Sequence, residues 1–330
     1  MAPRCNDCSS ARSTNVRMSS CSWSIPAACA CTKPKPRSGH SRRRCARCST
    51  CGVQAFRRSR SSPVPRSAAL AAACEHLRLL PDSRFGRSGP GVIETVHGKA
   101  ELDAGDPDAV PALFGASARV AAGIGTMQDD DIDSSRDTIR VAAQHPARFD
   151  GAMMGKWDAT LAARLAAAGL APAQAAESPS AFSIPEDAKA VDPMGWLWRI
   201  HGSNVHVLRP LSPLAFDPAV AVAIARAIAD GLPPYAPLVV VEDLPGHATT
   251  RVAEVLGVSE YLAAHAARLA MLRWEGHAVL GLLAGRGHGA AFFANASQAT
   301  TLDALAGARI EAMAVEAIAR VTRLPARAPR

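Results

Sequence analysis

The second half of the chain contains two short apolar runs that are separated by a long helical pattern. The runs are residues 238–241 and 278–283, and both are rich in Val and Leu. Between them, residues 252–275 have the spacing of an amphipathic helix that ends at Gly276. Because a strand–helix–strand unit joins parallel strands, this alternation predicts an α/β fold with layered sheets and flanking helices.

Further elements are expected upstream of the first run. Residues 205–208 predict a short strand, and Asp217 marks the start of a helix that Gly231 ends. Asp217 is a good N-cap, and the proline after it suits the first helical turn. Farther back, the Ala-rich residues 69–77 predict another helix.

The first 66 residues differ in composition from the rest of the chain. Residues 1–69 contain no Leu and no Glu, and eight of the nine Cys lie before residue 52. Residues 1–66 carry 14 Lys and Arg against one acidic residue, Asp7, so their net charge is +13 and the remainder carries −5 of the total +8. This composition predicts a disordered segment, and a GC-rich gene read in the wrong frame would produce it.

Two functional interpretations of this segment compete with a wrong reading frame. Cys residues with two residues between them, in 5–8 and 45–51, have a spacing that suits zinc, and arginines at 42–44 and 57–58 suit a nucleic-acid arm. The Cys lack a hydrophobic pattern around them, and aromatic residues for base stacking are nearly absent. We therefore expect residues 1–66 to be non-functional, with no metal and no nucleic-acid partner.

Four motifs follow one another in the C-terminal half. Residues 242–247 are Glu-Asp-Leu-Pro-Gly-His, and residues 274–279 are Trp-Glu-Gly-His-Ala-Val. Residues 285–292 are Gly-Arg-Gly-His-Gly-Ala-Ala-Phe, and residues 318–323 are Ile-Ala-Arg-Val-Thr-Arg. In order and spacing, residues 197–324 resemble the gamma subunit of biotin-independent malonate decarboxylase. The chain departs from that pattern with His247 in place of Gln and with an added methyl group at Ala290.

An earlier stretch resembles the C-terminal half of the beta subunit of the same enzyme. Residues 84–94 are Arg-Phe-Gly-Arg-Ser-Gly-Pro-Gly-Val-Ile-Glu, and residues 115–123 and the acidic run 129–131 follow in the family's order. Contiguous carboxylates rarely converge on one ion, so the acidic run predicts an exposed loop. The chain thus resembles a gene fusion with a partial beta-like segment at 67–150, a linker at 151–195 and a gamma-like domain at 196–330.

The resemblance implies a crotonase-like (ClpP/crotonase) fold and a carboxy-lyase reaction. Malonyl-S-acyl-carrier protein would become acetyl-S-acyl-carrier protein and carbon dioxide, with no biotin and no metal, because the substrate is carried on the carrier protein's prosthetic group. The partners implied are this carrier protein and other malonate decarboxylase subunits. No secretory signal opens the chain and no apolar window spans a membrane, so we expect a cytoplasmic protein without a membrane partner.

The resemblance also indicates where the site lies. Backbone N–H groups at a helix start can stabilise a thioester enolate, and the gamma side would hold the malonyl carboxyl while the beta side holds the thioester. The expected catalytic residues are Gly289, Ala290, Gly246 and His247, and the expected substrate-binding residues are His288, Gly287 and Pro90.

Two other functions stay open at this point. A beta subunit would carry glycine-rich turns of its own before residue 67, and none is readable, so the chain is alternatively a non-catalytic remnant that only pairs with other subunits. A crotonase-type hydratase or isomerase is a further alternative, although it would need an acidic residue within 290–300, where none occurs.

Overall fold

The computed structural model describes residues 53–56, 71–74, 76–144, 149–176, 182–209, 213–312 and 318–319. The chain divides into two units, Met1–Arg47 and Cys48–Arg330, and all the described residues lie in the second. The Cys and Arg motifs predicted at the N-terminus lie outside the described residues. Within that segment, β1 (Val53–Phe56) is a strand, which the composition did not predict.

The larger sheet contains seven strands and is mostly parallel. Its order is β10-β8-β7-β6-β5-β4, and β9 also pairs with β8. The strands are β4 (Lys189–Ala190), β5 (Leu197–Arg199), β6 (His206–Leu208), β7 (Leu238–Leu244), β8 (Val279–His288), β9 (Thr301–Ala304) and β10 (Arg309–Glu311). Strands β6 to β10 pair in parallel, whereas β4 and β5 are antiparallel. The parallel pairing of the two apolar runs is therefore confirmed.

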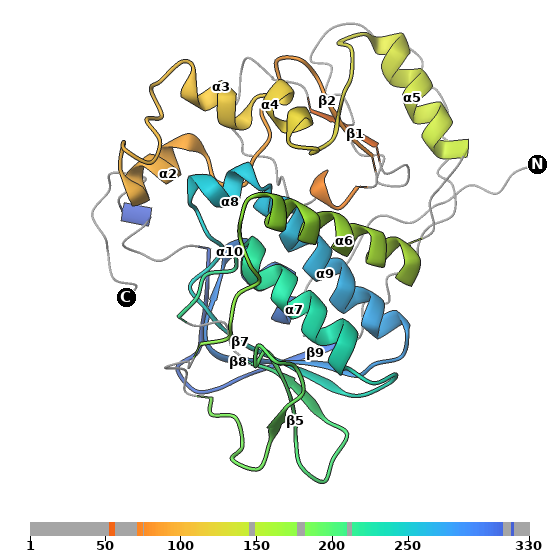
Figure 1. Cartoon of the computed structure of the whole chain (residues 1–330), viewed down its shortest axis with the longest axis vertical. Coiled ribbons are helices and arrows are strands. Elements are labelled where there is room, and N and C mark those ends of the chain that lie inside the picture. The colour runs from red at the N-terminus through yellow and green to blue at the C-terminus, as the bar shows by residue number, and fades with distance from the viewer. Residues whose placement is uncertain are drawn as a thin grey trace, which may run out of the picture. The chain divides into compact units, whose positions relative to one another are not determined.

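Three long helices lie side by side next to this sheet: α6 (Gly151–Ala167), α7 (Pro218–Gly231) and α9 (Val258–Trp274) (Figure 1). The core between helices and strands contains the fully buried Trp196, Phe216, Ile224, Leu238 and Tyr261. Burial of side chains of this size contributes about 1.5–3 kcal/mol each. The predicted α/β class, with layered sheets and flanking helices, is confirmed.

A smaller parallel sheet is ordered β1-β2-β3, and its strands β2 and β3 lie in the beta-like region. The elements of that region are β2 (His76–Leu79), α2 (Pro90–His97), α3 (Ala109–Phe114), α4 (Ala116–Ala121), β3 (Thr126–Met127) and α5 (Ile132–Gln144). The helix predicted over residues 69–77 is wrong at its end, because residues 76–79 form β2. Leu77 and Leu79 alternate with more exposed neighbours, and this period of two suits a strand.

The helix predicted over residues 252–275 is two helices. The first, α8 (Arg251–Val255), is capped by the Thr250 hydroxyl, which accepts from the Ala253 N–H. Gly257 then has φ +76°, a left-handed conformation that interrupts the helix before α9 begins. The cap predicted at Asp217 is confirmed, because its carboxylate accepts from the Val220 N–H at 2.8 Å.

The beta-like and gamma-like regions share a hydrophobic cluster. Ala263 of α9 belongs to it together with Leu77, Leu79, Phe85 and Ile124 of the beta-like region. An ion pair between Arg164 of α6 and Glu260 of α9 lies nearby, and Arg164 also donates to the Gly123 carbonyl at 3.2 Å. Thus the segment predicted as a linker contains a helix that packs on both regions.

The acidic run at 129–131 is exposed, as predicted, and precedes α5. The Asp131 carboxylate accepts from the Ser134 N–H at 2.7 Å, which is a helix-capping contact. Over the described ranges, no three or more His, Cys, Asp or Glu side chains are grouped to hold a metal ion. No helix among the same residues has the length and apolar character needed to cross a membrane.

Two glycine-to-alanine changes should shift stability in opposite directions. In Gly281→Ala, the new Cβ would lie 2.8 Å from the Leu302 side chain and 2.9 Å from the Ala296 carbonyl. This crowding should lower the free energy of unfolding by about 1–3 kcal/mol. In Gly155→Ala, on the open face of α6, nothing lies within 4 Å, and alanine should stabilise the helix by about 0.5–1 kcal/mol. Urea unfolding of both variants checks this pair, and equal shifts would contradict it.

Candidate functional site

Two turns meet at one edge of the larger sheet. β7 leads into the turn Pro245-Gly246-His247, and β8 ends at His288, directly before α10 (Gly289–Ala294). Because β7 and β8 are parallel neighbours, with Leu244 opposite Gly287, their carboxyl ends lie together. The β7 turn and the start of α10 therefore face each other, as the resemblance implied.

Both turns contain a glycine in a conformation that other residues rarely adopt. Gly246 has φ +109° and Gly289 has φ +53°. A Cβ on Gly246 would lie 3.5 Å from the His288 Cβ, and a Cβ on Gly289 would lie 2.8 Å from the Ala312 carbonyl. The β7 turn thus approaches His288, the residue before α10, and Gly289 approaches the residue that follows β10. The first N–H groups of any helix, here α10, have no intrahelical partners.

The His288 side chain, at the end of β8, contacts both the β7 turn and β10. Its ring Nδ1 lies 3.2 Å from the Pro245 carbonyl oxygen, and its Nε2 lies 3.2 Å from a carboxylate oxygen of Glu311 in β10. The side chain is buried, and both partners are acceptors. His288 thus joins the ends of β7, β8 and β10.

His247 is half-buried and contacts the beta-like region. Its turn is fixed by Phe216, whose N–H donates to the Gly246 carbonyl at 2.9 Å and whose carbonyl accepts from the Ala248 N–H at 2.9 Å. The His247 Nε2 lies 3.4 Å from the Ser88 hydroxyl. Burial, with a smaller effect from the positive charge of Arg87, lowers the pKa of His247 to about 4. The ring is therefore neutral near pH 7 in the unliganded protein.

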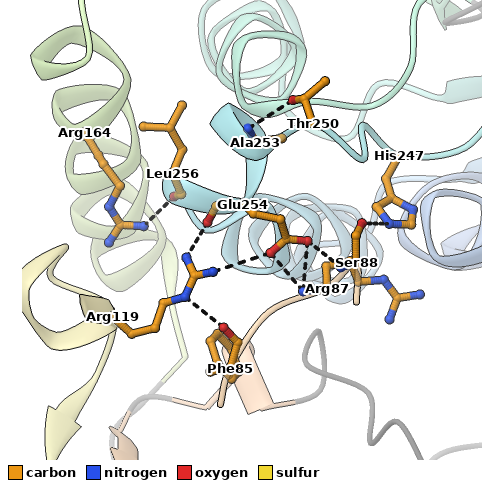
Figure 2. A network of polar contacts seen from close by, with 10 residues as sticks. All are labelled: Phe85, Arg87, Ser88, Arg119, Arg164, His247, Thr250, Ala253, Glu254 and Leu256. Carbon is orange, nitrogen blue, oxygen red and sulfur yellow. Dashed lines mark hydrogen bonds and ion pairs between the residues drawn. The ribbon is translucent and has the colours of Figure 1, made fainter. Parts of the chain in front are cut away.

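The loop that carries Ser88 is held by a buried carboxylate from α8 (Figure 2). The Arg87 N–H donates to both oxygens of Glu254, at 3.1 and 3.0 Å, and the Ser88 N–H donates to one of them. Arg119 of α4 pairs with the same carboxylate at 3.7 Å, and it also donates to the Glu254 backbone carbonyl. Glu254 is only 1% exposed, so its side chain is shielded from water.

The remaining predicted residue, Pro90, lies beside this loop. It occupies the first turn of α2, with Gly89 as N-cap and Ser88 one residue farther back. Pro90 therefore follows shortly after Ser88, the residue that contacts His247, whereas Gly287 and His288 end β8. All seven predicted residues lie at the β7 turn, at the junction of β8 and α10, or at the start of α2.

Sequence reasoning missed four residues of this site: Arg87, Ser88, Arg119 and Glu254. Arg87 and Ser88 lie inside a motif that carries the beta-like resemblance, which was the only signal for them. Glu254 is 166 residues away from Ser88, and in the sequence it looks like an ordinary exposed glutamate of a surface helix. No spacing rule connects residues so far apart.

A protein-family model describes the segment that carries both sheet turns. Residues 213–328 match the model of the malonate decarboxylase gamma subunit. The predicted resemblance to that subunit is confirmed for this segment. No curated protein matches the chain.

Solved structures similar to the chain include malonate decarboxylase assemblies and a subunit of an acyl-CoA carboxylase. A Pseudomonas malonate decarboxylase hetero-tetramer in complex with malonate is 28% identical, with a TM-score of 0.32, over 49% of this chain and 66% of that one. The Pseudomonas MdcD–MdcE hetero-dimer is 26% identical, with a TM-score of 0.32, over 48% and 65%. The beta subunit of P. aeruginosa geranyl-CoA carboxylase is 18% identical, with a TM-score of 0.36, over 78% and 50%.

The chain spans at most 66% of the length of these malonate decarboxylase chains. The TM-scores are low, so the functional proposal below rests on the family match of residues 213–328 and on the local geometry of the two turns.

Proposed function

We propose that the chain is a subunit of a malonate decarboxylase and acts on a malonyl group carried as a thioester on an acyl carrier protein. The products are the acetyl thioester and carbon dioxide. The observation that carries the proposal is that residues 213–328 match the gamma-subunit model and contain both facing turns. Other malonate decarboxylase subunits are the proposed partners, since the similar Pseudomonas structures are a hetero-tetramer and a hetero-dimer.

The proposed reaction breaks the bond between C2 of the malonyl group and its carboxylate. The bonding electrons move into the thioester carbonyl, which becomes an enolate, and C2 then takes a proton. The proposed donors to the enolate oxygen are the backbone N–H groups of Gly289 and Ala290, at the start of α10. A donor aimed at developing negative charge typically lowers the barrier by about 3–4 kcal/mol.

His247 is the proposed carrier of the proton that C2 takes up. Burial and Arg87 keep its ring neutral without substrate, because both disfavour the charged form. An anionic substrate or enolate beside the ring has the opposite effect, so binding would raise the pKa and recruit a proton from solvent. The thioester carbonyl is the electron sink, so the proposed step uses neither biotin nor a metal.

The test is release of carbon dioxide and acetyl-carrier protein from malonyl-carrier protein. The full chain is assayed alone and with a complete beta subunit, and the beta subunit alone is the blank. Turnover that depends on the chain supports the proposal, and a cytoplasmic location of the tagged chain in its host would agree with it. Absence of turnover in both mixtures favours the remnant that only pairs with other subunits.

We expect His247→Ala to lower kcat by about 10²-fold, the lower end of the range for general acid–base catalysis. His201→Ala is the matched control, because His201 is exposed in the turn after β5. Its kcat should equal that of the unmodified chain. An unchanged kcat in His247→Ala would assign His247 a purely structural role in the turn.

A further inference from the structure

We propose that Arg87, Ser88 and His247 form the subsite for the free carboxylate of the malonyl group, and that Glu254 is the positioning residue that holds it. This inference rests on the proposed function. It places the carboxylate at the junction of the beta-like and gamma-like regions. Both regions would then contribute to one end of the substrate.

The charges of this cluster leave room for one anion. Arg119 balances the negative charge of Glu254, to which it is paired, and His247 is neutral. Arg87 contributes a second guanidinium, whose Nε is buried and has no hydrogen-bond partner among the described residues. Two guanidinium groups and one carboxylate leave a single net positive charge, and a malonyl thioester carries a single negative one. A guanidinium is also the side chain best shaped to bind a carboxylate.

Two neutral hydrogen-bond donors, Ser88 and His247, lie near the Arg87 guanidinium. The Ser88 hydroxyl points toward the His247 ring in Figure 2, and the 3.4 Å separation is long for a hydrogen bond between them. Both groups can therefore turn a donor to a carboxylate oxygen. Figure 2 also shows the Arg87 guanidinium on the side of the network where His247 lies, away from Arg119. The three donors thus lie on the same side of the network.

Glu254 fixes the backbone from which Arg87 and Ser88 project. Its carboxylate accepts both of their N–H groups, and Arg119 fastens the loop a second time by donating to the Phe85 carbonyl at 2.8 Å. A Cβ on Gly86 would lie 3.0 Å from a Glu254 oxygen and 2.4 Å from the Phe114 ring, so the loop has no room to shift toward α8. Burial raises the pKa of Glu254, and the two amide donors and Arg119 oppose that rise.

A carboxylate subsite acts mainly on binding. The negative charge leaves the carboxylate as carbon dioxide forms, so Arg87 interacts more strongly with the substrate than with the transition state. Loss of Arg87 should therefore raise KM without lowering kcat. The acetyl product has no carboxylate, so its binding should not depend on Arg87.

The experiment compares malonyl-carrier and acetyl-carrier protein with the full chain and its beta subunit. Arg87→Met should raise KM for the malonyl form about 10–100-fold, as expected for lost hydrogen bonds to a charged group, and leave the Kd of the acetyl form unchanged. Arg136→Met, which removes an exposed arginine of α5, is the matched control and should alter neither value. An unchanged malonyl KM in Arg87→Met, or equal losses for both ligands, overturns the subsite.

Glu254→Gln tests the positioning role and should likewise weaken the malonyl form selectively. Glu260→Gln is its control, because Glu260 also pairs with an arginine, the partly buried Arg164, and no contact of Glu260 with the loop is seen in the described part of the chain. If Glu254→Gln fails to fold, Ser88→Ala replaces it, since that change keeps the Ser88 N–H and should raise malonyl KM at least threefold, roughly the loss of one hydrogen bond. An unchanged malonyl KM in Glu254→Gln overturns the positioning role, and an unchanged malonyl KM in Ser88→Ala removes the Ser88 hydroxyl from the subsite.

The two proposals can fail separately. If Arg87 makes the chain prefer the malonyl form but no carbon dioxide is released, the subsite is supported and the decarboxylase proposal is wrong. If turnover does not depend on Arg87, the decarboxylase is supported and the subsite proposal is wrong. If the chain binds neither thioester, both proposals are wrong.

Discussion

Arg119→Met should lower the free energy of unfolding by about 3–5 kcal/mol, the cost of breaking one side of a buried ion pair. Arg119 and Glu254 are 3% and 1% exposed as side chains, so water cannot replace the lost partner. Methionine keeps the length of the side chain but leaves the Glu254 carboxylate without its cation. It also removes the donor to the Phe85 carbonyl.

Urea unfolding of two further variants separates the buried charge from the loss of packing. Arg140→Met breaks the exposed pair with Asp137, whose side chains are 61% and 66% exposed, and should cost less than about 1 kcal/mol. The double variant Arg119→Met with Glu254→Gln removes the uncompensated charge and should recover part of the loss. If Arg119→Met is no more costly than Arg140→Met, Glu254 is not held as an ion in the core.

The parallel sheet could be predicted because its strands are apolar and because capping and helix-ending residues mark the helices between them. The run at 238–241 lies in the mostly buried β7, the run at 278–283 forms the start of β8 with Leu280 exposed, and Asp217 caps α7 as its sequence position indicates. The ends of the elements were less predictable. β7 continues through Glu242 and Asp243, which look like residues of a loop.

Tertiary contacts explain why these two acidic residues can lie in a strand. Glu242 accepts hydrogen bonds from Asn295 and Ala296, on the far side of α10. The Asp243 carboxylate accepts from the Arg286 N–H at 3.0 Å and occupies the space that a side chain at Gly285 would need. The partners come from β8 and beyond, so no local pattern around β7 reveals them.

In the candidate site, too, one part could be predicted from the sequence and another part depends on tertiary contacts. Gly246 and Gly289 could be expected to meet, because turns that follow neighbouring parallel strands share one edge of the sheet. The contact of Ser88 with His247 depends instead on how the beta-like region packs on α8 and α9. That packing is set by Glu254, Arg119 and the shared hydrophobic cluster, which are brought together only in the folded chain.

Glu242→Gln should make the protein less sensitive to rising pH. Glu242 is fully buried, and one of its oxygens, Oε1, has no hydrogen-bond partner among the described residues. Burial raises the pKa of Glu242 from 4.5 to about 8, so the folded protein keeps this carboxyl protonated where the unfolded chain has lost the proton. Its contribution to stability is complete below the unfolded pKa and is lost as pH rises through the folded pKa.

The loss should amount to about 1.4 kcal/mol per pH unit, which is about 3 kcal/mol between about pH 5 and 7. Glutamine cannot ionise, and its carbonyl can still accept from Asn295. As pH rises, the free energy of unfolding of the variant should therefore increase by this amount relative to that of the unmodified protein. Urea unfolding at several pH values measures the difference, with the exposed Glu275→Gln as a control that should follow the unmodified protein. Parallel stability curves for Glu242→Gln and the unmodified protein would mean that Glu242 is ionised in the core, and Asn295 and Ala296 would then have to stabilise its charge.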